Sequence, residues 1–371
     1  MSTRLKRRPM KSAIPASLAI VTAACGLAFS TTAAAQSSVT LYGIVDQSVR
    51  YQTNANANND ALWQVTNGAV TNSRFGFKGT EDLGGGLKAI FQLESGINPQ
   101  NGTLANGPRL FDRYAFVGLQ NQYGTIKIGR QATEAFNVYG DFDPLTIGNY
   151  ANNSWMYNIT RGRVDNAVSY AGTFGGLSVG ATYGFGNTAG TMAASNYWGA
   201  RAAYAMGPFQ LAGVYQQARD ASKRVQQMWG LGGIYSVSIA KVFVGYMGGR
   251  DRSGWLDGTL NDPSQTVATG NLNDNPRKDM TFYLGTTIQA MPNLAITGAA
   301  YFDDIKNINA QAGDAGSGRR YTYVLLAEYA LSKRTQVYGT VDYNKVSGAA
   351  RVELPGNSTQ VGVGTGIRHI F

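Results

Sequence analysis

Few residues of this chain have the chemistry that catalysis or metal binding requires. The 371 residues include one histidine, His369, and one cysteine, Cys25. A Ser-His-acid triad requires a histidine beside the nucleophile, and zinc sites usually combine several histidine or cysteine ligands. The sequence therefore favours neither a hydrolase nor a metal-dependent enzyme, and we expect no catalytic site, no metal and no cofactor.

Two further patterns resemble ligand-binding motifs but lack the context that such motifs need. The stretch "GVGTG" at 362–366 has the glycines of a phosphate loop, but no helix follows to supply the N-terminus that binds phosphate. The acids of "YFDDIKN" and "NLNDNPRKD" lack the regular ligand spacing of a calcium loop. The glycines are more typical of strands or subunits that approach each other closely.

Charge is the strongest remaining signal, and part of it belongs to a leader. The chain has 32 Lys and Arg against 22 Asp and Glu, a formal charge of +10. A basic start, the apolar run "AIPASLAIVTAACGLAF" and three alanines predict a signal peptide over 1–35 and a mature chain over 36–371. Five of the 32 basic residues leave with the leader, so 27 against 22 remain and the charge falls to +5. This weakens a nucleic-acid-binding interpretation.

The type of leader also indicates how the chain is exported. A lipoprotein signal at Cys25 is the alternative, but Thr22 stands where such signals carry a leucine-like residue. After Gln36 no apolar run approaches the length of about 18 residues that a membrane helix requires. The sequence therefore predicts an exported protein without a helical anchor.

Composition and periodicity favour many short strands over helices. Glycine (47) and tyrosine (21) are abundant, and both are mediocre helix formers. In "VTLYGIVDQSVRY", alternate positions place Val39, Leu41 and Val45 on one face, and Asp46 and Arg50 on the other. The final stretch, "QVGVGTGIRHIF", alternates in the same way. A period of two with one apolar and one polar face indicates half-buried strands.

Sixteen such segments can be placed along the chain, with connections that alternate between short and long. Short ones such as "EDLGGG" and "MGP" alternate with long ones such as 52–70, 132–160 and 305–318. The predicted strands are 38–51, 71–81, 87–96, 109–120, 123–131, 161–172, 177–187, 196–206, 207–219, 224–237, 238–250, 278–290, 292–304, 319–331, 333–346 and 358–371.

Two architectures join strands of this kind by turns. A soluble β-sandwich has its apolar face inside, whereas a membrane barrel turns that face towards lipid and its polar face towards water. The apolar faces here end in Tyr and Phe, as an interfacial girdle requires, and the strands have the length of a tilted membrane crossing. A closed barrel also pairs every backbone polar group in lipid. We therefore expect an all-β fold, a 16-stranded antiparallel transmembrane β-barrel.

Charged side chains on the polar faces would then line the channel. The basic candidates outnumber the acidic one, Asp46, which favours a weak preference for anions. The basic candidates are Arg50, Lys78, Lys88, Lys127, Arg130 and Arg368.

The whole mature chain resembles the general diffusion porins of Gram-negative outer membranes, particularly those of β-proteobacteria. The motifs that carry the resemblance occur in order along the chain: "SSVTLYGIVD", "SRFGFKGTEDLGGGLKAIFQLE", "DRYAFVGLQNQYGTIKIGRQ", "RVDNAVSY" and the terminal "GIRHIF". The resemblance implies an outer-membrane homotrimer through which ions and small hydrophilic solutes pass passively. It also implies contact with outer-membrane lipid and lipopolysaccharide, and recognition of Phe371 by the barrel-assembly machinery.

The same resemblance implies where the channel is narrow. In the family, the long loop after the fifth strand folds into the lumen; here this constriction loop is 132–160, with Glu134, Asp141 and Asp143. By motif position, the arginines of the opposite wall correspond to Arg74, Arg113 and Arg163. The acidic motif of the family is not reproduced letter for letter, and "DFDPL" is its best counterpart.

Two other functions remain open at this stage. A substrate-selective sugar or nutrient channel would carry a track of aromatic side chains, for which Tyr283, Tyr301 and Tyr338 are the inward-facing candidates. A barrel enzyme is the second alternative, and the single histidine counts against it.

Overall fold

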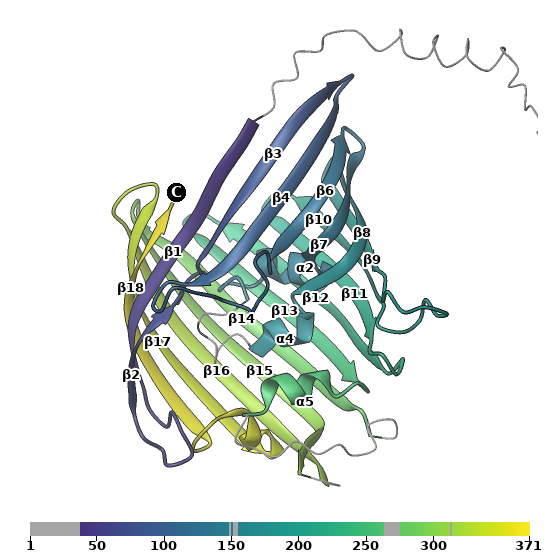
Figure 1. The fold of residues 1–371 in the computed structure, drawn as a ribbon. Helices are drawn as coiled ribbons and strands as arrows, with labels where there is room; N and C mark the ends of the chain where they lie inside the picture. Colours follow the sequence, from purple (N-terminus) through teal and green to yellow (C-terminus); the bar gives the residue numbers. More distant parts are fainter. Residues whose placement is uncertain (1–37, 148–149, 151–154, 263–274, 312–313) are drawn as a thin grey trace, which may run out of the picture. The chain divides into compact units, whose positions relative to one another are not determined.

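The computed structural model describes residues 38–147, 150, 155–262, 275–311 and 314–371, which belong to one compact unit. Sixteen long strands form a closed antiparallel barrel around a lumen (Figure 1). The predicted signal peptide, 1–35, lies outside the described residues. The barrel strands are β1 (Ser38–Gln52), β3 (Arg74–Gly84), β4 (Leu87–Asn98), β6 (Tyr114–Asn121), β7 (Gly124–Ala132), β8 (Arg163–Phe174), β9 (Leu177–Gly184), β10 (Tyr197–Met206), β11 (Phe209–Arg219), β12 (Val225–Val237), β13 (Ala240–Asp251), β14 (Arg277–Met291), β15 (Leu294–Gln311), β16 (Asp314–Ala330), β17 (Thr335–Gly348) and β18 (Thr359–Ile370).

The first and last strands close the barrel. β1 pairs with β18 from Ile44↔Ile370 to Gln52↔Gly362, and its other edge pairs with β3. Phe371 extends this closure, because its backbone N–H donates to the carbonyl of Gly43 and its carbonyl accepts from the N–H of Gly43. The Phe371 ring lies against Gly43, where a side chain would collide with it. The predicted sixteen-stranded antiparallel barrel is confirmed.

The largest differences from the predicted strand boundaries lie on the long-connection side of the barrel. The predicted connection 52–70 contains the short strand β2 (Leu62–Asn67), which continues the edge that β3 begins. β15 and β16 extend through most of the predicted connection 305–318, whereas β6 begins later than the predicted 109. A further short strand, β5 (Thr103–Leu104), pairs with β4. Apolar alternation stops where strands leave the membrane, so it could not reveal these extensions.

The two faces of the strands differ as predicted. Along β18, Val361, Val363 and Ile367 are exposed on the outside, whereas Gly362 and Gly364 between them are buried. Exposed large apolar side chains recur on the outer face of many strands. In water-soluble proteins, large apolar side chains are mostly buried away from water. An apolar exterior of this kind is therefore typical of a surface that faces lipid.

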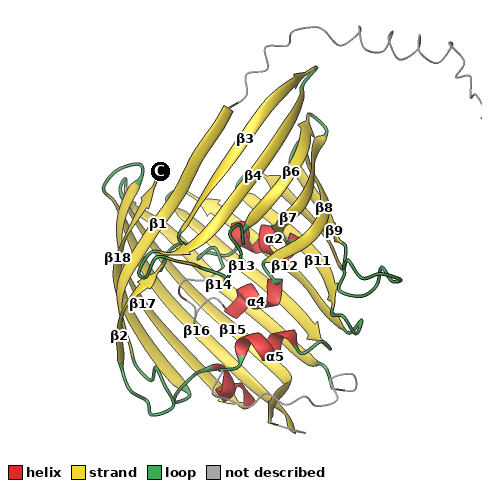
Figure 2. Ribbon diagram, in the orientation of Figure 1, coloured by secondary structure: helices red, strands yellow, loops and turns green. Residues whose placement is uncertain are grey.

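Helices lie inside the ring of strands rather than on its outer face (Figure 2). They are α2 (Glu134–Phe142) and α4 (Trp155–Thr160) between β7 and β8, α5 (Trp255–Leu260) after β13, and a 3-10 turn, η1 (Ala349–Glu353), before β18. Among the described residues, no helix is long and apolar enough to cross a membrane.

Inward-facing glycines of β18 make room for side chains from neighbouring elements. A Cβ at Gly362 would collide with Arg50 and Asp342, and one at Gly364 would collide with the hydroxyl of Tyr150. The "GVGTG" stretch therefore serves close approach inside the barrel.

Candidate functional site

The connection between β7 and β8, residues 133–162, is called the lumenal segment here. It begins on the wall formed by β10 and β11. Thr133 caps α2 by accepting a hydrogen bond from the N–H of Phe136. The N–H of Glu134 donates to the hydroxyl of Tyr197 (2.9 Å), and the N–H of Ala135 donates to Oε1 of Gln216 (3.0 Å). Two otherwise unpaired N–H groups of the first helical turn are thus bound by the barrel wall.

Glu134, one of the predicted constriction acids, points into that wall. Its Oε2 lies 2.7 Å from Nε of Arg201, its Oε1 accepts from the hydroxyl of Thr182 (2.5 Å), and its side chain is 3% exposed. The geometry makes Glu134 an anchor of α2. Arg201 was not predicted as a site residue, although a charged residue within a predicted strand is a signal for one.

The end of α2 is fixed to β14 and β15. The hydroxyl of Tyr283 donates to the carbonyl of Phe142 (2.9 Å), and the hydroxyl of Tyr301 donates to Oδ1 of Asp143 (2.7 Å). Oδ2 of Asp143 accepts from the N–H groups of Leu145 (3.1 Å) and Ile147 (2.6 Å). Asp143, also predicted at the constriction, is therefore a buried acid that shapes the segment.

Further along, the lumenal segment crosses to the opposite side of the barrel. The hydroxyl of Tyr150 donates to Oγ of Ser48 on β1 (3.0 Å), and the Arg50 guanidinium lies 3.8 Å from the centre of the Tyr150 ring. Nε1 of Trp155 donates to the hydroxyl of Thr322 on β16 (3.2 Å). In its described part, the segment forms no hydrogen bond to β3, β4 or β6.

The inner wall therefore has two parts. We call the inward acids of β1, β14, β15 and β17 the covered wall, because each is at most 1% exposed beneath the segment, α5 or η1. We call the basic residues on or beside β3, β6, β7 and β8 the basic wall. The covered wall comprises Asp46, Asp279, Asp303 and Asp342, and the basic wall comprises Arg74, Lys78, Arg113, Lys127 and Arg163.

The three predicted constriction arginines lie together on the basic wall. Nε of Arg113 pairs with Oε1 of Glu94 (2.6 Å), and the Arg163 guanidinium lies 4.1 Å from the centre of the Phe136 ring. Arg74 donates to the carbonyl of Asn72 (3.1 Å) and interacts electrostatically with Arg113 and Arg163. Three guanidiniums thus share one carboxylate. Because Arg does not deprotonate, repulsion within this group persists unless solvent anions offset it.

The other charged residues that were predicted to line the channel lie in different parts of the barrel. Lys127 faces inward, with its ammonium 5.0 Å from the centre of the Phe116 ring, and Lys78 lies similarly over Tyr42 at 5.2 Å. Lys88 is exposed next to the turn that joins β3 and β4.

Arg130 does not line the lumen, so that prediction is wrong. It pairs in register with Ala115 on the same face as Ile128, which is exposed on the outside. There its guanidinium bonds to Asp165 (2.5 Å). Strict alternation from Ile128 would have placed Arg130 outward.

Asp46 also differs from its predicted role. It faces inward but is fully buried, and its carboxylate accepts from the N–H groups of Val70 (3.1 Å) and Thr71 (2.8 Å) and from the hydroxyl of Tyr338 (2.5 Å). A carboxylate with three donors inside the protein is held in place and is not available to solutes. Its neighbour Arg368, also predicted to line the channel, donates to the hydroxyl of Thr71 (2.7 Å).

Other buried charges of this side are paired with one another. Arg50 bonds to Oδ1 of Asp342 (3.0 Å). Arg277, which is 1% exposed, bonds to Asp257 (3.0 Å), Asp279 (2.8 Å) and Glu353 (2.6 Å). This network joins β14 to α5 and η1, and it was not predicted, because its members are far apart in the sequence.

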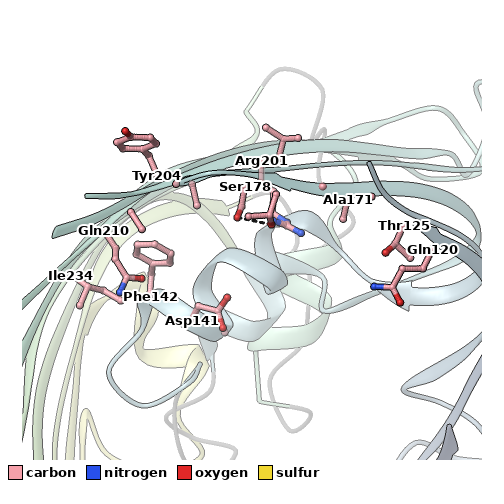
Figure 3. A pocket seen from close by; sticks show the side chains of 18 of the residues that line it. Gln120, Thr125, Asp141, Phe142, Ala171, Ser178, Arg201, Tyr204, Gln210 and Ile234 are labelled. Carbon is pink, nitrogen blue, oxygen red and sulfur yellow. Dashed lines mark hydrogen bonds between the residues drawn. The ribbon is translucent and has the colours of Figure 1, made fainter. Parts of the chain in front are cut away.

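Asp141 is the predicted acid that faces open space. It borders a cavity of about 840 Å³ between α2 and the wall, with Arg201 and Ser178 on the opposite side (Figure 3). Loss of solvent raises the pKa of Asp141 above its usual value, and the positive charge of Arg201 counteracts this rise. The pair Asp141 and Arg201 thus sets opposite charges across a water-accessible gap.

Known proteins are similar to this chain in sequence and in fold. Residues 19–349 match the family model described as Gram-negative porin. An outer membrane porin protein of Bordetella pertussis is 31% identical over 95% of this chain and 99% of its own length, and outer membrane porin protein 32 of Delftia acidovorans is 31% identical over 93% and 97%. An anion-selective porin from Comamonas acidovorans has a similar fold, with a TM-score of 0.72, 24% identity and coverage of 91% of this chain and 100% of that chain. The chain therefore belongs to the Gram-negative porin family and is a β-barrel protein of the outer membrane.

Proposed function

We propose that this porin is a general passive channel for ions and small hydrophilic solutes, with a preference for anions. One observation carries the proposal: the inner acids are buried on the covered wall, whereas Arg74 and Arg113 stand on the basic wall, with Arg163 beside them against Phe136 of the lumenal segment. Sixteen strands enclose a lumen wide enough for water, so solutes cross without losing their hydration.

Selection then follows from the field across the narrow part. Rings or clusters of Arg and Lys favour anions, because a passing cation meets repulsion that water only partly screens. The acids that line a solute's path are few: Glu94 is already paired with Arg113, and Asp141 lies opposite Arg201. We therefore assign the narrow part to the space between the lumenal segment and the basic wall. Glu134 and Asp143 serve to hold the segment there.

Single-channel recordings test this assignment. Wild-type protein in planar bilayers is compared with Arg74→Ala and Arg113→Ala in the same salt. We expect stepwise conductance that is larger in both variants, with a weaker anion preference, because each change removes bulk and positive charge from the narrow part. Unchanged conductance and selectivity in both variants would remove the two arginines from the constriction.

The substrate-selective alternative has little support from the tyrosines that suggested it. Tyr283, Tyr301 and Tyr338 do face inward, but each is only 3% exposed, and their hydroxyls bond to Phe142, Asp143 and Asp46 respectively. Side chains that the lumenal segment covers cannot form a path for sugars.

The proposal extends to export, assembly and the lack of an enzymatic role. We propose that 1–35 is cleaved on export, that the mature chain forms a homotrimer among lipid and lipopolysaccharide, and that the barrel-assembly machinery recognises Phe371. The position of Phe371 at the β1–β18 closure supports the last point. The single histidine, His369, lies on the outer face of β18 beside Thr335 (2.9 Å), which supports a channel without catalysis.

A further inference from the structure

A second cavity lies at the mouth of the barrel, on the side of the long connections. It has a volume of about 390 Å³ and lies where the lumenal segment, the ends of β8 to β11 and α5 meet. This volume is at the lower end of the range of about 300–1,000 Å³ that small-molecule sites occupy. Its apolar floor is formed by Val164, Tyr197 and Ala218, which pack together.

One cation in this cavity forms no hydrogen bond or ion pair through its side chain among the described residues. The Arg161 guanidinium lies 4.4 Å from the centre of the Trp255 ring on α5, and its interactions with Asp251 and Asp220 are electrostatic, without a direct contact. The ring contact holds the guanidinium beside Trp255, but an aromatic ring is not a hydrogen-bond acceptor of the kind that the guanidinium N–H groups prefer.

The acids of the same lining are already neutralised. Asp165 pairs with Arg109 (3.0 Å) and Arg130 (2.5 Å), and Asp220 pairs with Arg224 (2.7 Å). None of these three arginines lines the cavity. The net positive charge of the lining therefore comes from Arg161, Arg163 and Arg219. Arg163 also belongs to the basic wall, so the same side chain borders both the cavity and the proposed narrow part.

We propose that this cavity binds small organic carboxylates that carry a planar apolar group, before they pass the narrow part. The carboxylate would take the free edge of Arg161, since guanidinium donors match both oxygens of a carboxylate. The apolar group would lie on the Val164, Tyr197 and Ala218 floor beside Trp255. The inference rests on the proposed function only in that it places this mouth on the path of solutes.

Benzoate is the probe for this site, and benzamide is its neutral match. With wild-type channels in planar bilayers, benzoate added on the mouth side should reduce the chloride current in a saturable way, and benzamide should not. Arg161→Gln should raise the half-saturating benzoate concentration about tenfold, since a charge-assisted bond is lost. Trp255→Ala should raise it several-fold.

Arg319→Gln is the matched control, because Arg319 is an exposed arginine, 59% accessible, whose partner is Asp304 on β15. An equal shift in Arg161→Gln and Arg319→Gln, a non-saturable benzoate effect, or equal effects of benzoate and benzamide would overturn the inference. An anion-preferring channel that shows one of these results would leave the proposed function intact. A cation-preferring channel would instead overturn the proposed function, whatever benzoate does.

Discussion

The covered wall and the basic wall occupy equivalent inward positions of one barrel, yet they treat charge in opposite ways. On the covered wall, Asp46, Asp279 and Asp342 are at most 1% exposed and are bonded to arginines, hydroxyls or backbone N–H groups. On the basic wall, Arg74 and Arg163 form no ion pair among the described residues, and Arg163 borders the cavity at the mouth.

The difference shows what an inserted segment does to a pore. Removing a charge from water costs several kcal/mol unless donors or opposite charges replace the water, so the acids of the covered wall need such partners. Asp46, Asp279 and Asp342 have several, and Asp303 accepts from the hydroxyl of Thr281 (3.1 Å). The basic wall remains in contact with water, so its charges need no such partners. It can therefore keep an excess of positive charge. The lumenal segment thus narrows the lumen and also determines the sign of the charge that a solute meets there.

The largest expected effect concerns the covered wall. Arg277→Met leaves Asp257, Asp279 and Glu353 buried without their shared cation, and removing one partner of a buried ion pair costs about 3–5 kcal/mol. The midpoint of urea unfolding in detergent should fall accordingly. Arg319→Met, in the exposed pair with Asp304, should cost less than about 1 kcal/mol. Equal losses in the two variants would show that the network is not buried as described.

The next effect separates the two walls directly. Arg74→Gln combined with Arg163→Gln should lower the chloride-to-potassium permeability ratio about five- to thirtyfold, because two charges worth roughly 0.5–1 kcal/mol each leave the path of the ions. Arg50→Gln removes one positive charge that is paired with the covered wall and should leave selectivity nearly unchanged while it lowers stability, since Asp342 loses this partner. Reversal potentials in a salt gradient measure the first effect, and urea unfolding measures the second. If Arg50→Gln changed selectivity as much as the double variant, the two walls would not differ.

A smaller effect concerns the attachment of the lumenal segment. Tyr301→Phe removes the donor to Asp143 and should weaken the attachment by about 1 kcal/mol. The open-channel current should then fluctuate more at an unchanged mean. Tyr343→Phe is the control, because this tyrosine is 36% exposed on the outer face and stacks on Tyr323. Quiet current in Tyr301→Phe would mean that this bond does not hold the segment.

The smallest effect is a pH dependence at Asp141. Desolvation raises the pKa of this carboxyl, so it takes up a proton at a pH above the usual range for Asp. As pH falls from 7 through that pKa, the negative charge opposite Arg201 disappears and the anion preference should rise modestly. In Asp141→Asn the charge is absent at every pH, so this part of the pH response should vanish. A wild-type preference that falls on acidification would contradict the assignment.

The fold could be predicted from the sequence, because the period of two is repeated in every strand. This pattern depends only on residues within the strand itself. The boundaries of β15 and β16 were wrong, because residues such as Lys306 and Asn309 lie in strand that continues beyond the apolar pattern. Arg74, Arg113 and Arg163 were predicted by resemblance to a family, and no local rule would have grouped them.

The roles of the loop acids could not be predicted, because they depend on partners far away in the chain. Glu134 is held by Arg201 and Asp143 by Tyr301, and neither pairing leaves a trace in the neighbouring residues. Only the path of the lumenal segment decides which acid is buried and which, like Asp141, remains in contact with water.

The most direct test of the central claim is the reversal potential of the wild-type channel across a tenfold potassium chloride gradient at neutral pH. If the open wall is basic and the acids are covered, chloride permeates better than potassium, and the preference grows as the salt is diluted, because screening weakens. A potassium preference, at any dilution, would contradict the account.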